Sequence, residues 1–112
     1  MPSIQLQLDT GNLYNIYNVI TGVQTIGVTI NSPNKTMPGI SRNCDRLVIS
    51  SDPINGANEI AYGDGSIDTD GTKGKVLLAG DSDVLQSPPA VSLPNKFLSV
   101  SANDTLVNLY WE

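Results

Sequence analysis

The apolar residues of this chain come in short runs of alternating polarity, and clusters of Gly, Asn, Asp and Pro separate one run from the next. In residues 3–9, Ile4, Leu6 and Leu8 alternate with polar side chains, which predicts a half-buried β-strand. Further strands are expected at residues 23–30, 44–50, 59–62, 75–79, 96–101 and 106–111. Short strands at this spacing predict a mainly β fold, either an antiparallel two-sheet sandwich or a jelly-roll-like barrel.

Two segments depart from the strand pattern. An apolar stripe at helical spacing runs from Leu13 to Ile20, and it predicts one short N-terminal helix over residues 12–20, capped by Thr10 or Asn12. Its β-branched and tyrosine content leaves a strand as the alternative. The proline-rich segment between Gln86 and Asn95 is expected to be extended, at a sheet edge or in a crossover.

A length of 112 residues has room for one hydrophobic core. We therefore expect a single domain over residues 1–112, with strand, helix and loop in residues 1–43 and the strand-rich part in residues 44–112. The one cysteine, Cys44, excludes an intramolecular disulfide and is expected to be a small buried residue. Since no signal-like or membrane-spanning segment is seen, synthesis in the cytoplasm without secretion is expected.

Charge and composition argue against nucleic-acid binding and against catalysis. The net charge is −5, and phosphate backbones are bound mainly by Lys and Arg. There is no histidine, which removes the usual proton shuttle and His-ligated metal chemistry. Seven of the eleven acidic residues lie between positions 52 and 83, mostly beside turn formers, where Asp bonds nearby backbone amides. Paired carboxylates remain the one catalytic alternative, and no enzyme activity is expected.

The acidic segment from Asp64 to Asp70 has one further interpretation. Residues 66–71 place oxygen ligands at alternate positions before a glycine, as at the start of a calcium loop. The twelfth position from Ser66 is Leu77, where such a loop has a bidentate glutamate. A plain hairpin loop is therefore predicted, with a surface calcium ion as the alternative. No metal or cofactor is expected elsewhere.

The aromatic residues suggest a second binding alternative, because aromatic faces suit sugar rings. These are Tyr14, Tyr17, Tyr62, Tyr110 and Trp111. A row of them on the surface would indicate a carbohydrate-binding module. Their positions follow the structural periods, so the prediction places them in the core and on sheet faces.

Residues 44–112 resemble a small β domain of structural proteins in tailed-bacteriophage virions. The resemblance lies in a strand ending in an Asp-Pro turn (Cys44–Pro53), a strand closing in Gly-Asp (Glu59–Asp64), a leucine then Gly-Asp turn (Lys75–Ser82), and a last hairpin (Phe97–Asp104 and Leu106–Tyr110). Members of that family serve as capsid decoration proteins, minor head proteins or fibre bases. The resemblance implies attachment to a virion and brings no catalytic residues.

The function expected from these observations is that of a non-enzymatic bacteriophage virion protein. The leading hypothesis is a capsid decoration or stabilising protein on the outer head surface; the alternatives are a tail, neck or fibre-base component and a carbohydrate-binding module. Expected partners are the major capsid protein or other virion proteins and further copies of the chain, with neither nucleic acid nor membrane. The predicted contacts are a first strand that adds to a neighbour's sheet and a polar loop: Ile4, Leu6, Leu8, Pro33, Asn34, Lys35 and Met37.

Overall fold

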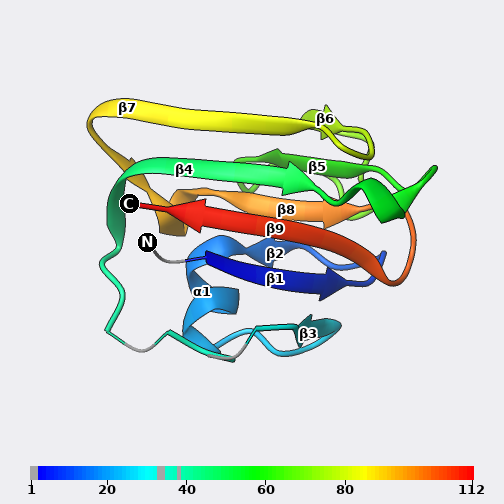
Figure 1. Ribbon diagram of the computed structural model, residues 1–112, viewed down its shortest axis with the longest axis horizontal. Coiled ribbons are helices and arrows are strands. Elements are labelled where there is room, and N and C mark those ends of the chain that lie inside the picture. The colour runs from blue at the N-terminus through cyan, green and yellow to red at the C-terminus, as the bar shows by residue number, and fades with distance from the viewer. Residues whose placement is uncertain (1–2, 33–34, 38) are drawn as a thin grey trace.

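The computed structural model describes residues 3–32, 35–37 and 39–112, and of residues 87–89 it describes the backbone. Two antiparallel sheets pack face to face, with one short helix, as the alternating pattern predicted (Figure 1). Sheet A has the order β3-β1-β9-β4-β7, and sheet B has the order β2-β8-β5-β6. The strands are β1 (Ser3–Leu8), β2 (Tyr14–Asn15), β3 (Val28–Ile30), β4 (Asn43–Ser51), β5 (Ile60–Gly63), β6 (Lys75–Leu77), β7 (Ser82–Ser92), β8 (Phe97–Val100) and β9 (Thr105–Trp111). The helix α1 spans Ile16–Thr21, and two short 3-10 helices are η1 (Pro53–Asn55) and η2 (Leu93–Asn95).

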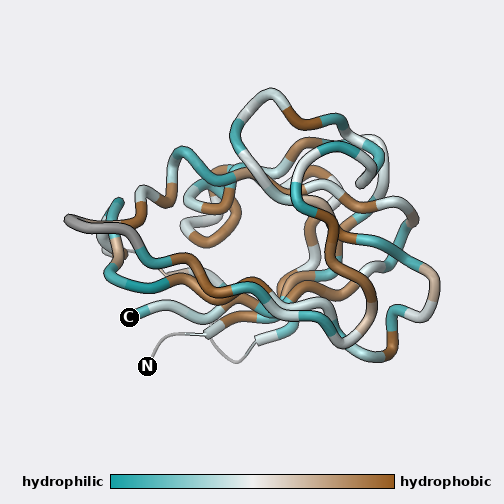
Figure 2. The backbone as a smooth tube through the Cα atoms, turned by 90° about the horizontal axis from the view of Figure 1, so that it is seen from above, coloured by the Kyte–Doolittle hydropathy of each residue, from teal (hydrophilic) through white to brown (hydrophobic). Residues whose placement is uncertain are grey.

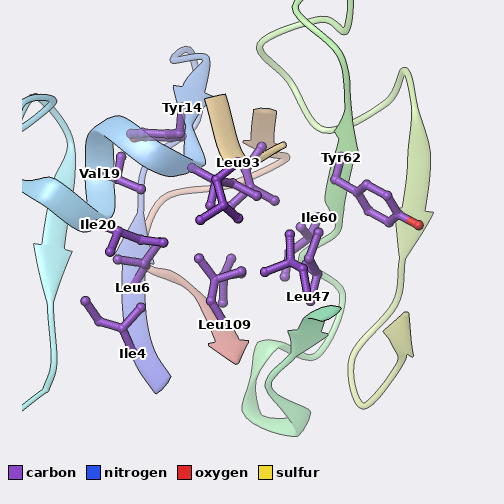
Figure 3. Packing of buried hydrophobic residues seen from close by; sticks show 14 of the residues in the cluster. Ile4, Leu6, Tyr14, Val19, Ile20, Leu47, Ile60, Tyr62, Leu93 and Leu109 are labelled. Carbon is purple, nitrogen blue, oxygen red and sulfur yellow. The ribbon is translucent and has the colours of Figure 1, made fainter. Parts of the chain in front are cut away.

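The core lies between the two sheets. Figure 2 shows the molecule from above, with sheet A along the lower edge of the picture and most of the remaining backbone above it. Every second residue of a strand points inward, so β1 contributes Ile4, Leu6 and Leu8 to a cluster that also holds Leu109 of β9 and Leu47 of β4; Figure 3 shows part of this cluster. Each such buried aliphatic side chain contributes about 1.5–3 kcal/mol relative to an exposed one.

The helix begins four residues later than the stripe predicted, and the expected caps Thr10 and Asn12 are wrong. Tyr14 and Asn15 form β2, paired with β8, and Asn15 caps α1 by accepting a hydrogen bond from the N–H of Asn18 at 3.0 Å. The Tyr14 hydroxyl lies 2.9 Å from the carbonyl oxygens of both Asp9 and Gly27 and donates to one of them, which anchors this residue in the sandwich. The helix and strand interpretations are therefore each right for one half of the segment.

The predicted strand over residues 23–30 is confirmed only at β3. The chain leaves α1 through Gly22, whose φ of 83° is a left-handed conformation suited to glycine. Val23 and Ile26 are exposed in the turn that follows. Gln24 holds that turn, because its side chain accepts from the N–H of Asn15 and donates to the carbonyl of Leu13. The backbone N–H groups of Val23 and Gln24 both donate to the Asn18 carbonyl, so they are not available to a sheet.

The proline-rich segment lies in β7 at an edge of sheet A, as expected. β7 pairs with β4 in a register that shifts between Cys44 and Arg46. Cys44 lies opposite Val91 and Arg46 opposite Gln86, so Asp45 alone faces residues 87–90. The extra residues form a bulge, which accommodates prolines that cannot donate to the ladder.

The loop between β5 and β6, residues 64–74, folds over the outer face of sheet B. Ala61 and Ser99 point to that face and are nevertheless fully buried. Ser99 accepts from the N–H of Gly71 at 3.1 Å, and Ile67 of the loop is itself buried. Gly71 has a φ of 76°, and a Cβ atom there would lie 2.6 Å from the Ser101 nitrogen. In the described part of the chain nothing crosses the outer face of sheet A in this way (Figure 1).

Candidate binding face

The uncovered face of sheet A carries an ordered array of side chains. Residues directly opposite each other on neighbouring strands share a face. Tyr110 of β9 lies opposite Ser3 of β1 and Val48 of β4, and Val48 lies opposite Val84 of β7. The next row holds polar residues. We call the central residues of the two rows the binding face: Gln5, Val48, Ser50, Val84, Asn108 and Tyr110.

The polar row is held by its own hydrogen bonds. Gln5 donates to Asn108 Oδ1 at 3.0 Å, and both amides donate to Asp52 Oδ2 at 3.3 Å. At the other end of the row, the hydroxyls of Ser50 and Ser82 are 2.7 Å apart. Side chains that are already fixed lose little conformational entropy when a partner binds. The row is therefore prepared for contact.

The apolar row is partly open to solvent. Val84 is exposed, and Val48 and Tyr110 are half-buried. The Arg46 guanidinium lies 6.0 Å from the centre of the Tyr110 ring and forms an ion pair with Glu112 at 3.1 Å. Strands β1, β4 and β9, with Asn31 and Ser32, line a shallow hollow of about 340 Å³ beside this row. The combination of an aromatic ring, valines and satisfied amides suits a protein partner.

Two carboxylates of the loop over sheet B are bound to residues of that same loop. Ser66 bonds the Asp64 carboxylate through its hydroxyl and its N–H, and these bonds lower the pKa of Asp64. Thr72 does the same for Asp70 and lowers its pKa. These are turns of the kind that Asp commonly closes. Among the described residues no group of three or more Cys, Asp or Glu side chains is placed to hold a metal ion.

One carboxylate ties the two sheets together. Tyr62 of β5 points from the core toward β7 (Figure 3), and its hydroxyl donates to Asp83 Oδ2. Burial, together with the hydrogen bond to Asp83 and the charge of Asp83, raises the pKa of Tyr62 well above its ordinary value. The pair therefore holds the edge strand β7 against sheet B.

Cys44 is buried, as the sequence predicted. It lies at the start of β4, and burial raises the pKa of its thiol. A thiol held in the protonated form is a poor nucleophile. Packing in the core is therefore sufficient to account for a cysteine at this position.

The predicted contact residues do not come together on one surface. Ile4, Leu6 and Leu8 are in the core, and β1 pairs with β9 along its whole length and with β3 from Leu6 to Leu8. These three side chains therefore close the sandwich and are not surface contacts, while the addition of this strand to a neighbour's sheet stays a prediction.

The predicted loop contacts have mixed outcomes. Pro33 and Asn34 lie outside the described residues. Lys35 is exposed. Met37 packs against the core and donates its N–H to the Ile20 carbonyl at 3.0 Å, so the core contact explains its apolar side chain.

An exposed aromatic row is likewise contradicted. Tyr14, Tyr62 and Trp111 are buried, and Tyr17 is half-buried with the Arg42 guanidinium 5.2 Å from its ring centre. The described residues thus do not form the row of exposed aromatic rings that the carbohydrate-binding alternative required; Tyr110, which is half-buried, is the aromatic residue of the uncovered face of sheet A.

The sequence held a signal for the binding face that the expectation did not use. Val48 and Val84 are apolar residues at positions that alternate with core residues, where a solvated strand would carry polar side chains. The exposed apolar residues Ile54 and Leu78 were also missed. Ile54 lies inside a predicted turn, and Leu78 breaks the alternation of its strand.

Among the described residues no helix is long and apolar enough to cross a membrane.

The chain was compared with known proteins at three levels. No protein-family model, curated protein or solved structure matches it.

Proposed function

We propose that this chain is a non-enzymatic structural protein of a bacteriophage virion, and specifically a capsid decoration protein that lies on the outer head surface. The observation that carries the proposal is the difference between the two outer faces of the sandwich. The loop of residues 64–74 covers one face, while the other presents the binding face with its side chains fixed.

The dimensions of that face fit a stable protein contact. The molecule measures 33 × 28 × 24 Å, and the view down its shortest axis shows sheet A face on (Figure 1). The two longer dimensions of the whole molecule, 33 and 28 Å, multiply to about 900 Å²; this product is an upper bound for the face, and it is of the same size as the ~800 Å² that each partner contributes to a standard interface. A flat β-sheet that lies on the surface of a shell makes such a contact without rearrangement.

The virion setting is supported by the resemblance of residues 44–112 to phage structural domains. A decoration protein contacts the major capsid protein and neighbouring copies of itself, and many weak contacts on one particle add up to tight retention. A tail, neck or fibre-base protein would use the same face with fewer copies. The two settings differ in stoichiometry.

The test of the setting is quantitative mass spectrometry of density-purified virions. A ratio to the major capsid protein near capsomer stoichiometry supports decoration. A handful of copies moves the protein to the neck, tail or fibre base, and absence from the particle refutes the virion proposal.

The test of the face uses rebinding of purified variants to particles that lack the protein. Val84→Asp places a charge in the apolar row, and we expect it to lose binding. Val23→Asp is the matched control, because Val23 is exposed on a turn away from sheet A, and it should bind as the unchanged protein does. Equal binding of both variants would show that the binding face makes no contact with the shell.

A further inference from the structure

Asn55 is the one asparagine of the chain that is followed by glycine. In an Asn-Gly dipeptide the backbone nitrogen of the glycine can attack the side-chain amide of the asparagine, because glycine has no Cβ atom to hinder the approach. The reaction is a spontaneous deamidation, and water is the one co-reactant that it needs. The dipeptide is therefore a candidate site of covalent modification.

The chemistry of this site needs no catalyst. The Gly56 nitrogen gives its proton to water or hydroxide of the solvent and forms a bond to Asn55 Cγ. The bond between Cγ and Nδ2 breaks, and ammonia leaves with a proton from water. Water then opens the resulting succinimide ring at either of its carbonyls, which leaves aspartate or isoaspartate at position 55. The net change is the addition of one water and the loss of one ammonia.

The fold treats the two reacting groups differently. Gly56 is exposed with a φ of 60°, and a Cβ atom there would meet nothing within 4 Å, so water reaches this residue. Asn55 is 7% exposed. Its Nδ2 donates to the Ser51 hydroxyl at 3.0 Å and to the Leu106 carbonyl at 2.8 Å, and its Oδ1 accepts from the Leu106 N–H at 2.8 Å. The side chain is thus the protected partner of the reaction.

The backbone of the turn around Asn55 is fixed as well. The N–H of Asn55 donates to the Asp52 carbonyl, and the N–H of Asn58 donates to the Asn55 carbonyl, both at 3.0 Å. Ring closure removes Nδ2 and brings Cγ within bonding distance of the Gly56 nitrogen, so the side chain must first leave its three hydrogen-bond partners. Three hydrogen bonds of ordinary strength make such an open form about 100-fold rarer than the closed one.

Both products fit the folded structure poorly. Aspartate places a carboxylate oxygen against the Leu106 carbonyl, where the amide donated a hydrogen bond. Isoaspartate adds a carbon atom to the backbone at the end of η1, because the main chain then runs through Cβ. Either product lowers the free energy of unfolding. Chemical modification of the unfolded chain is a general cause of irreversible unfolding.

We propose that Asn55 is a deamidation site that folding protects, and that its reaction in unfolded chains makes unfolding irreversible with time. Folded copies keep the amide. Copies that stay unfolded convert and no longer return to the native stability, so the dipeptide records how long a chain has been unfolded. This inference does not depend on the virion setting, because it concerns the purified chain alone.

The experiment incubates purified protein in mildly alkaline buffer, once folded and once unfolded in guanidinium chloride, and samples both over time. Peptide mapping by mass spectrometry measures the conversion of amide to acid at each asparagine, and chromatography separates aspartate from isoaspartate. The internal reference is Asn31, which is exposed in the folded protein and is followed by Ser32. Each sample is then returned to native buffer, and urea unfolding followed by the fluorescence of Trp111 measures its stability.

We expect Asn55 to convert at least about 100-fold faster in the unfolded chain than in the folded protein, and Asn31 to convert at similar rates in both. The fraction of chains that fail to regain the stability of fresh protein should equal the fraction converted at Asn55. Equal rates for Asn55 in the two states would overturn the inference. So would full recovery of stability by converted chains, or equal protection of Asn31, which would place the cause outside the hydrogen bonds of Asn55.

Gly56→Ala is the matched variant for the chemistry. Its methyl group hinders the attacking nitrogen, while the open surroundings of Gly56 leave room for the methyl group in the folded protein. Unfolded Gly56→Ala should convert several-fold more slowly at Asn55 and lose its ability to refold correspondingly later, judged against fresh protein of the same variant. If it loses that ability as fast as the unchanged protein does, another reaction makes unfolding irreversible and the inference is wrong.

Discussion

Asn55 is a buried polar residue in η1, directly after β4, and replacing it should lower the free energy of unfolding more than its size suggests. Its side chain accepts from the N–H of Leu106 and donates to the Leu106 carbonyl, both at 2.8 Å. It also donates to the Ser51 hydroxyl at 3.0 Å. The side chain thus joins η1 to the start of strand β9.

The loss of stability expected for Asn55→Ala follows from the hydrogen-bonding groups that the substitution leaves without a partner. The Leu106 carbonyl keeps a hydrogen bond from the N–H of Asp52 at 3.3 Å, but the Leu106 N–H loses its acceptor. A buried donor without a partner costs about 1–3 kcal/mol, and the lost bond to the Ser51 hydroxyl adds about 1 kcal/mol. We expect the free energy of unfolding to fall by about 3 kcal/mol. Urea unfolding followed by the fluorescence of Trp111, the one tryptophan, measures it.

Asn55→Asp separates the hydrogen bonds from the shape of the side chain. One carboxylate oxygen still accepts from the Leu106 N–H, but the other faces the Leu106 carbonyl where the amide donated. Repulsion and burial raise the pKa of this new carboxyl in the folded state, so folding favours its protonated form, which can donate. The stability of Asn55→Asp relative to the unchanged protein should therefore rise as the pH is lowered, while the deficit of Asn55→Ala stays constant. Parallel pH curves for both variants, or a loss below about 0.5 kcal/mol in Asn55→Ala, would refute this reasoning.

Three further predictions concern the packing of the sandwich. Because the pKa of Tyr62 is raised in the folded state, the free energy of unfolding should fall as the pH rises above about 10. In Tyr62→Phe this fall should be less steep, while the variant should lose about 1 kcal/mol of stability at neutral pH. Urea unfolding at neutral and at high pH tests this, and equal slopes for the two proteins would contradict it. Gly71→Ala should destabilise the protein far more than Gly56→Ala, because both glycines have positive φ but only Gly71 has backbone atoms within 3 Å of the new Cβ atom. Thermal unfolding compares the two variants, and similar losses of stability would show that the loop shifts to accommodate the Cβ atom. Cys44 should react with a thiol reagent at the rate of unfolding, because it is buried; rapid labelling of the folded protein would place it on the surface.

Strands β1 and β9 were predictable because each carries its own evidence, whereas the first half of β7 was not predicted as a strand. In β1 apolar and polar residues alternate without interruption, and in β9 buried positions alternate with half-buried ones from Thr105 to Trp111. A period of two residues is a local property, so neither strand requires knowledge of its partner. The edge position of β7 was predictable for a similar reason, since proline lacks the N–H that an interior strand donates.

The remaining features depend on partners that are distant in the sequence. Tyr14 belongs to a strand because β8 lies beside it. The helical spacing of the apolar residues that begins at Leu13 does not indicate that pairing. The binding face arises where β1, β4, β7 and β9 meet, and strand order is not written in local patterns. The exposed positions of Ile54 and Leu78 have the same origin, because the two turns that carry them are joined by the hydrogen bond from the Ser51 N–H to the Asp81 carbonyl.

The edges of the two sheets bear on how the protein behaves when many copies are crowded together. Sheet edges promote fibrils when they are long and straight, because their free N–H and carbonyl groups extend a neighbour's sheet. The edge strands β2, β3 and β6 have three residues or fewer, and the long edge strand β7 is bent by its bulge. Backbone pairing between copies is thereby discouraged at every edge that the structure describes. A concentrated solution of this protein should accordingly resist amyloid formation, leaving side-chain contacts to govern how copies meet.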